Sequence, residues 1–197
     1  MVGLLTTINE AFDRVAMHAV RADLLRAQAD AAGAPLWPVP IPFPCSNEAY
    51  ERAMRAAVDR ACTEGISAIA FGDLFLEDIR RYREERLRDS GLLPLFPLWG
   101  LPTAALAREM IGAGLRARIT CVDPKQLPAE FAGREFDASL LDDLPAGVDP
   151  CGERGEFHTF AYDGPMFARP LPLKSGEVVA RDGFVFADFT LSESPRG

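Results

Sequence analysis

The sequence predicts an α/β protein in which helices cover both faces of a mostly parallel sheet, followed by a smaller mixed or β-rich domain. Over residues 2–122, short apolar strand-like runs alternate with longer helical segments. That alternation is typical of βαβ units, whose strands pair in parallel. After residue 122 the helices become short and alternating β segments dominate. We therefore predict two domains, residues 1–122 and residues 123–197.

The strands of the first domain are expected in short apolar runs that begin directly at the N-terminus. They are residues 2–8, 36–41, 66–71, 93–98 and 117–122. Two prolines in the second run suit an edge strand or a strand end, because proline cannot donate a ladder hydrogen bond.

Four helices are expected between these strands, and capping residues mark several of their ends. They cover residues 11–32, 46–64, 76–89 and 103–112. Gly33 and Pro35 end the first helix, and Gly65 ends the second. Ser46 or Asn47 provides the N-cap of the second helix.

The second domain is expected to contain one short helix and three β segments. The helix covers residues 139–144, and the β segments are residues 156–162, 177–181 and 183–191. The last two are joined at Asp182-Gly183, which is a strong signal for a two-residue hairpin turn.

Composition and charge exclude several classes of protein. The chain has 197 residues and a net charge of −8, so it can bury one sizeable core and is not expected to bind a nucleic-acid backbone. No segment approaches 18 apolar residues, and no signal peptide is recognisable, which predicts a cytoplasmic protein without a membrane partner. The four cysteines are widely spaced and support neither a structural zinc nor a disulfide framework.

The densest group of chemically useful side chains lies between Asp149 and Thr159. Eleven residues hold several carboxylates, a thiol, one of the two histidines and two glycines. Glu156 and His158 are two apart in a strand-like segment, so they share a face about 7 Å apart, within joint reach of one metal or substrate group. Glu153 and Glu156 are spaced for binding in a bent loop, with a salt-bridged surface turn around Arg154 as the alternative.

Cys151 lies in the same segment and has two interpretations. It is either a nucleophile or a small buried residue in a tight turn. No sequence neighbour is an obvious base, which favours the second.

Asp73 follows the third predicted strand, where ligands bind in open α/β sheets. We therefore expect it to contact a ligand, whereas Glu77 and Asp78 are at least as well explained by the dipole of the next helix. The arginines and acidic residues of that helix are typical of a solvated face with i,i+4 pairs. Trp99, in Phe96-Pro97-Leu98-Trp99-Gly100, offers a wall against a flat ring or simply packs in the core.

These segments together resemble the diphthine–ammonia ligase family of N-type ATP pyrophosphatases, also described as adenine nucleotide alpha hydrolases. The resemblance covers nearly the whole chain. The matching pieces are residues 3–7 with Asn9, Met17-His18, residues 71–78, residues 96–100, residues 149–159 and residues 163–167.

The resemblance implies a nucleotide-binding domain of the HUP (Rossmann-like) type followed by a substrate domain. It also implies an amide-forming ligase, in which ATP adenylates a carboxylate with release of pyrophosphate and ammonia then displaces AMP. In the family the carboxylate belongs to diphthine on elongation factor 2. Another protein or small carboxylate is the alternative where diphthamide is not made, and a homodimer stays open.

The same resemblance implies roles for individual residues. The nucleotide would be bound by Thr6, Asn9, Gly72, Asp73 and Trp99, with Mg²⁺ at Asp73. The catalytic residues would be Glu153, Glu156 and His158. The substrate would be bound by Gly152, Gly155 and Thr159.

One departure from the family concerns its phosphate-binding loop. The family begins with a strand, a Ser-Gly-Gly-x-Asp-Ser loop and a helix, and this sequence contains no Ser-Gly-Gly. Such loops hold phosphates with backbone N–H groups. Without that strand, residues 2–8 and 66–71 are expected to lose a shared neighbour and to leave edges unpaired.

A misplaced gene start is the favoured explanation, with truncation and loss of catalysis as the others. Two functions follow: an ATP-dependent ligase, or a non-catalytic nucleotide-binding or interaction module.

Overall fold

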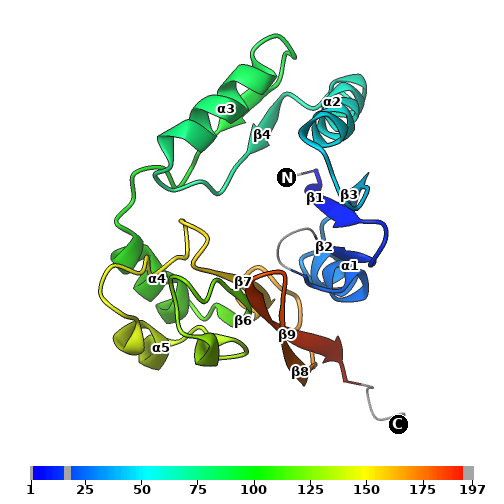
Figure 1. Ribbon diagram of the computed structural model, residues 1–197. Coiled ribbons are helices and arrows are strands. Elements are labelled where there is room, and N and C mark those ends of the chain that lie inside the picture. The colour runs from blue at the N-terminus through cyan, green and yellow to red at the C-terminus, as the bar shows by residue number, and fades with distance from the viewer. Residues whose placement is uncertain (1, 16–18, 193–197) are drawn as a thin grey trace.

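The protein has a mixed α/β fold in which three sheets are arranged around an opening (Figure 1). The computed structural model describes residues 2–15 and 19–192. In that part of the chain the strands form a three-stranded, a two-stranded and a four-stranded sheet. The single parallel sheet predicted for the first domain is therefore not formed.

The first sheet contains the most N-terminal strand in its middle. β1 (Leu4–Asn9) pairs in parallel with β3 (Leu36–Ile41) over its whole length. At its end it also pairs antiparallel with β2 (Arg14–Val15). The two long strands confirm the predicted runs, and β3 lies at the sheet edge, as its prolines suggested.

The helix predicted over residues 11–32 is wrong in its first half. The chain forms β2 there, and α1 (Ala22–Ala31) begins only afterwards. Asp13 and Ala19 both have positive φ angles, 49° and 54°, which a right-handed helix does not contain. The reason is tertiary, because side chains of this segment bind a distant strand, as shown below.

The second sheet is a short parallel pair between two long helices. β4 (Ala68–Ala70) pairs with β5 (Leu93–Leu95), and α2 (Asn47–Thr63) and α3 (Glu77–Leu87) precede and connect them. The Ser46 hydroxyl accepts a hydrogen bond from the Ala49 N–H at 3.2 Å, which confirms the predicted N-cap.

The third sheet is wholly antiparallel and has the strand order β7-β6-β9-β8. Its strands are β6 (Arg116–Val122), β7 (Phe157–Asp163), β8 (Leu173–Arg181) and β9 (Phe184–Leu191). The strand predicted over residues 117–122 exists as β6, but it pairs antiparallel with β7 and β9, so its expected place in the parallel sheet is wrong. Asp182 and Gly183 have φ angles of 52° and 84° and form the predicted tight hairpin turn. The division at residue 122 remains a prediction.

The main core lies on the two faces of this antiparallel sheet. α4 (Thr103–Gly112), the 3₁₀ turn η1 (Ala129–Phe131) and α5 (Ala138–Asp143) contribute to a cluster with Phe157 on one face. α1 contributes Leu24 and Ala31 to a second cluster with Phe160. Successive β7 side chains thus pack on opposite faces, as the alternation predicted. α1 therefore covers the antiparallel sheet, although the sequence predicted that it would cover parallel strands.

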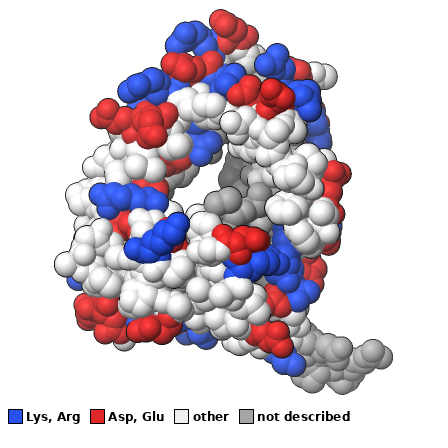
Figure 2. Space-filling view, in the orientation of Figure 1, with Lys and Arg blue, Asp and Glu red and all other residues white. Residues whose placement is uncertain are grey.

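An apolar groove separates the two parallel pairs. It has a volume of about 920 Å³ and is lined by residues of β1 and β4, together with Trp37, Val58 and Leu92. Among the described strands, no ladder joins β1 to β4. The space-filling view shows the hollow between the upper and lower parts of the molecule (Figure 2).

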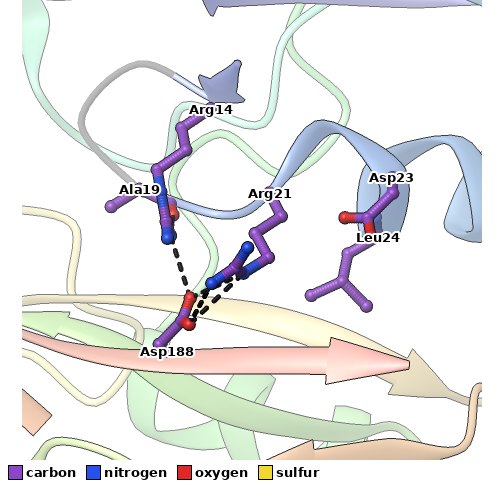
Figure 3. A network of polar contacts seen from close by, with 6 residues as sticks. All are labelled: Arg14, Ala19, Arg21, Asp23, Leu24 and Asp188. Carbon is purple, nitrogen blue, oxygen red and sulfur yellow. Dashed lines mark hydrogen bonds and ion pairs between the residues drawn. The ribbon is translucent and has the colours of Figure 1, made fainter. Parts of the chain in front are cut away.

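Asp188 of β9 clamps the N-terminal segment onto the antiparallel sheet (Figure 3). Arg14 donates to it at 2.9 Å, and Arg21 donates from Nε and Nη2 at 3.0 and 2.6 Å. Arg14 also donates to the Ala19 carbonyl at 2.6 Å. These contacts hold residues on either side of the turn in a non-helical path.

The helices of the described ranges include none that is both long enough and apolar enough to span a bilayer. In α3 the predicted pairing is seen between Arg80 and Glu84 at 2.8 Å. Acidic and basic side chains are intermixed around α2 and α3, in the upper part of the molecule in Figure 2.

Candidate functional site

The candidate site is built around the backbone of Leu74, where three segments predicted to be functional meet. Residues 72–75 follow the end of β4, and the Leu74 N–H donates to Glu153 Oε1 at 2.7 Å. The Leu74 carbonyl accepts a hydrogen bond from the Gly100 N–H at 2.8 Å. The structure therefore brings together residues 72–75, the end of the Phe96–Gly100 segment and the loop that begins at Asp149.

Two buried carboxylates determine the shape of that loop. Asp149 is 5% exposed, and its Oδ2 accepts hydrogen bonds from the N–H groups of Cys151 at 3.1 Å and Glu153 at 3.0 Å. Glu156 is 2% exposed, and its two oxygens accept from the N–H groups of Asp149 and Arg154, both at 2.9 Å. A buried carboxylate that binds backbone N–H groups is satisfied without a ligand.

The geometry differs from the shared face predicted for Glu156 and His158. The Glu156 carboxylate turns back into the loop, so it does not stand beside the histidine on an open strand face. His158 and Thr159 are half-buried in β7, where they lie opposite Cys121 and Ile119 of β6. Arg154 approaches Glu156 only at 3.8 Å, so a salt bridge around Arg154 does not dominate the turn.

The two glycines of the loop have different surroundings. Gly152 is buried with a φ of 68°, and a Cβ there would lie 2.7 Å from the Phe157 carbonyl oxygen. Only glycine fits this position without displacing the backbone. Gly155 has a φ of 79° and open space beside it, so the left-handed backbone is its only requirement. Binding of substrate by either glycine remains a prediction.

Asp73 lies at the predicted strand end and is held by an ion pair. Arg83 of α3 donates to its two oxygens at 2.5 and 3.0 Å, and the Asp73 side chain is 13% exposed. The Arg83 guanidinium also lies 4.5 Å from the centre of the Phe71 ring. A bidentate arginine occupies the lone pairs that a metal would use.

The fit of the residues to a metal ion is therefore poor in this arrangement. Within the described ranges, no group of three or more His, Cys, Asp or Glu side chains could hold a metal ion. A Mg²⁺ ion at Asp73 would have to displace Arg83. The metal assignment of Asp73 remains a prediction, and no chemical step is derived through a metal here.

An aromatic cluster lies beside the Leu74 junction. Phe71 stacks on Phe96 with ring centres 5.5 Å apart, and Phe96 meets Trp99 edge-on at 6.1 Å. The Arg80 guanidinium lies 4.8 Å from the ring centres of both Phe96 and Trp99. Trp99 is half-buried and therefore packs against protein groups on at least one side.

Thr6 and Asn9 are separated from this junction in the bonding pattern. Thr6 lies opposite Pro38 in the β1–β3 ladder, and the Asn9 side chain accepts from the Ala11 N–H at 3.0 Å. In residues 2–15 and 19–192, no hydrogen bond or ion pair joins either of them to Gly72 or Asp73. Met17 and His18, which carry part of the resemblance, lie outside the described residues.

Cys151 has the properties of a structural thiol. Its Sγ donates to the Thr103 carbonyl at 3.4 Å, which ties the loop to the start of α4. Burial, followed by the negative charges of Asp149 and Glu153, raises the pKa of Cys151 to about 11. The thiol is protonated at neutral pH and is a poor nucleophile, in line with the turn interpretation favoured above.

Sequence reasoning missed Arg83 and the role of Asp149. Arg83 is one of several arginines in α3, and nothing in its local sequence distinguishes it from its neighbours. Asp149 did carry a signal, because an Asp before Pro-x-Gly readily accepts hydrogen bonds from the following backbone. The two long cavities of the structure are lined by neither Asp73 nor Trp99.

Comparison with known proteins supports the family suggested by the motifs. The family model described as "Diphthamide synthase C-terminal domain" matches residues 102–187. The chain is 35% identical over 147 residues to the diphthine–ammonia ligase of Homo sapiens, covering 72% of this chain and 53% of that protein. It is 31% identical over 157 residues to the Bos taurus protein of the same name, covering 75% and 57%.

A more distant relative has the same name. The Schizosaccharomyces pombe diphthine–ammonia ligase is 27% identical over 139 residues, which are 68% of this chain and 22% of that protein. The chain spans about half the length of the mammalian relatives it matches. The matched family domain contains α4, the antiparallel sheet up to Ala187 and the loop that carries Glu153. The chain belongs to the diphthine–ammonia ligase family.

Proposed function

We propose that this protein takes part in ATP-dependent amide formation, with the nucleotide near residues 72–75 and Trp99 and the acceptor near residues 149–159. The single observation that carries the proposal is the junction at Leu74. There, Glu153 of the family-specific loop binds the backbone that follows β4, and the Phe96–Gly100 segment binds it from the other side. Ligand sites at the carboxyl ends of strands are common in α/β proteins.

The proposed chemistry has two steps. An acceptor carboxylate oxygen attacks the α-phosphorus of ATP, which forms an acyl adenylate and releases pyrophosphate. The nitrogen of ammonia then attacks the acyl carbon, and AMP leaves with the oxygen that came from the carboxylate. The proton lost from nitrogen passes to a base, and half-buried His158 is the proposed candidate, with Thr159 as a binding group beside it.

The roles of the glutamates follow from their surroundings. Glu156 and Asp149 are buried and bonded to backbone N–H groups, so we assign them to shaping the acceptor loop. Gly152 and Gly155 permit the turns of that loop. Thr6 and Asn9 are proposed to contribute to the nucleotide side from β1.

We also propose the wider setting implied by the family. It comprises a HUP-type nucleotide-binding arrangement, Mg²⁺ bound chiefly through the phosphates of ATP, and a cytoplasmic location. Mg²⁺ commonly binds through substrate phosphates with only one or two carboxylates. The acceptor is proposed to be diphthine on elongation factor 2 or another carboxylate, and a homodimer is open to direct measurement.

The test follows the acceptor oxygen. The chain is incubated with ATP, magnesium, ammonia and an acceptor whose carboxylate carries ¹⁸O, and the AMP is examined by mass spectrometry. One ¹⁸O in AMP together with pyrophosphate release is the expected result. Label from ¹⁸O-water in AMP, without label from the acceptor, would show hydrolysis and contradict the ligase proposal.

Binding measurements separate the alternative. Nucleotide binding without turnover, under conditions in which a mammalian relative is active, would favour the non-catalytic module. Absence of both binding and turnover would contradict both functions.

A further inference from the structure

We propose that Glu153 is a positioning residue, which fixes the backbone of residues 73–75 for the nucleotide through the Leu74 N–H and exchanges no proton with the substrate. This inference rests on the function proposed above and narrows the role of one residue in it. It follows from four features of the molecule: the contact itself, the support behind it, its effect on Asp73 and the neighbouring Arg154.

The contact joins two segments that are distant in sequence. Glu153 Oε1 accepts from the Leu74 N–H at 2.7 Å and lies 3.5 Å from the Phe75 N–H. A carboxylate that accepts from backbone N–H groups is stabilised in its charged form, and such charge-assisted bonds are stronger than neutral ones. The same oxygen is a poor proton acceptor for a substrate while it holds this bond.

The loop is constructed so that Glu153 reaches this backbone. The Glu153 N–H is itself bound by the buried Asp149 carboxylate at 3.0 Å. The next N–H along the chain, that of Arg154, is bound by buried Glu156 at 2.9 Å. Both ends of the Glu153 peptide unit are therefore held before its side chain extends to Leu74, which limits the conformational entropy lost in making the contact.

The contact restrains the segment that carries Asp73. Arg83 holds the Asp73 carboxylate from α3, while Glu153 holds the next peptide N–H from the opposite side of the chain. Gly100 holds the Leu74 carbonyl. The strand end is thus fixed by three groups from three separate segments, as preorganised binding sites require.

Arg154 reinforces the same junction. Its guanidinium lies 5.0 Å from the centre of the Phe75 ring. Two successive loop residues, Glu153 and Arg154, therefore contact two successive residues, Leu74 and Phe75. This pairing predicts that the loop and the strand end move as one unit.

The test uses the whole chain and four variants. Glu153→Ala removes the acceptor, and Glu153→Gln keeps a neutral oxygen that can accept from the same N–H. Glu130→Ala changes an exposed glutamate in η1 as the surface control. Asp188→Asn weakens the distant clamp as a control for loss of stability without a change at the site.

Two quantities are measured for each: hydrogen exchange of the peptide covering residues 72–76, and the Kd for ATP with magnesium by calorimetry. Glu153→Ala is expected to expose the Leu74 amide to exchange and to weaken ATP binding about tenfold, the effect of losing one charge-assisted hydrogen bond. Glu153→Gln is expected to stay within about threefold of the unchanged protein, since it keeps the hydrogen bond. Both controls should leave the Kd unchanged.

Each alternative result has a definite meaning. Faster exchange in Glu153→Ala with an unchanged Kd would show a structural contact only and would overturn the positioning role. Loss of binding or turnover in Glu153→Gln equal to that in Glu153→Ala would point to the charge or the proton and would also overturn it. Absence of ATP binding by the unchanged chain would instead overturn the proposed function, and this inference with it.

Discussion

At the level of single residues, the candidate loop depends on carboxylates that are consumed by the fold. Asp149 and Glu156 lie among the most buried polar side chains of the described residues, and each binds two backbone N–H groups. Glu153, only half-buried, is the one that extends to another segment. A segment that looks in sequence like a row of acids is therefore divided by burial into support and contact.

Glu156→Ala is expected to lower the free energy of unfolding by about 3 kcal/mol, because it leaves two buried N–H groups without an acceptor. Urea denaturation followed by circular dichroism measures this change. Glu130→Ala, at an exposed position, is the matched control and should change stability by less than about 0.5 kcal/mol. An equal effect of the two substitutions would contradict the supporting role of Glu156.

The cysteines are expected to differ in reactivity. Burial and neighbouring acidic groups raise the pKa of Cys151 to about 11, and burial raises the pKa of Cys121 to about 11 as well. At pH 8 both should react with iodoacetamide about 100-fold more slowly than a thiol with an ordinary pKa, because the thiolate is the reactive form. Peptide mapping should show exposed Cys62 modified first; early modification of Cys151 would revive its role as a nucleophile.

At the level of elements, the position of α1 is determined by contacts that the local sequence does not reveal. Leu24 and Ala31 of α1 pack on Phe160 of β7, and Asp188 of β9 holds the arginines before the helix. The two elements are more than 150 residues apart in the chain, as Arg21 and Asp188 show. The clamp therefore joins the N-terminal segment to the antiparallel sheet.

The clamp should make stability depend on pH in the acidic range. Burial alone would raise the pKa of Asp188, but hydrogen bonds from Arg21 and Arg14 lower it below its ordinary value. A depressed pKa in the folded state contributes stability above the unfolded pKa of about 4, and this contribution is lost as pH falls through the folded value. Asp188→Asn should lose about 2 kcal/mol at pH 7.

The same variant should also lose less stability than the unchanged protein between about pH 5 and pH 2. Thermal unfolding at a series of pH values measures both effects. Parallel acid limbs for the two proteins would show that Asp188 is not the titrating group.

Across the whole molecule, the core is unevenly distributed. The antiparallel sheet is packed on both faces, whereas the cluster beside β4 and β5 has three fully buried residues: Ala61, Leu87 and Leu92. An open groove of about 920 Å³ lies next to that smaller cluster. Local stability follows buried apolar contacts.

Hydrogen exchange should therefore divide the chain into two parts. Amides of β6, β7 and β9 are expected to exchange at least about 100-fold more slowly than those of β4 and β5, because opening the antiparallel sheet exposes more of the core. Mass spectrometry of peptic peptides measures the difference. Equal protection of both regions would show that the molecule opens only as a single cooperative unit.

Local patterns were sufficient for much of the fold and for the family. Alternation predicted the two faces of β7, Ser46 predicted the cap of α2, and Asp182-Gly183 predicted the hairpin turn. These features depend on neighbours a few residues away, so the sequence contains what is needed to predict them. The motifs around residues 71–78, 96–100 and 149–159 were likewise enough to suggest the family that the comparisons support.

The remaining features depend on partners far away in the chain. β6 reads like any buried strand, and only its neighbours β7 and β9 make it antiparallel. Residues 11–21 were predicted to be helical, yet ion pairs with Asp188 accompany an extended path there. The carboxylate of Glu156 turns inward and that of Glu153 reaches Leu74. Residue types and their spacing thus marked a candidate site in the sequence, but burial and long-range hydrogen bonds, which no local pattern contains, decided which acid supports the loop and which acid joins it to the strand end.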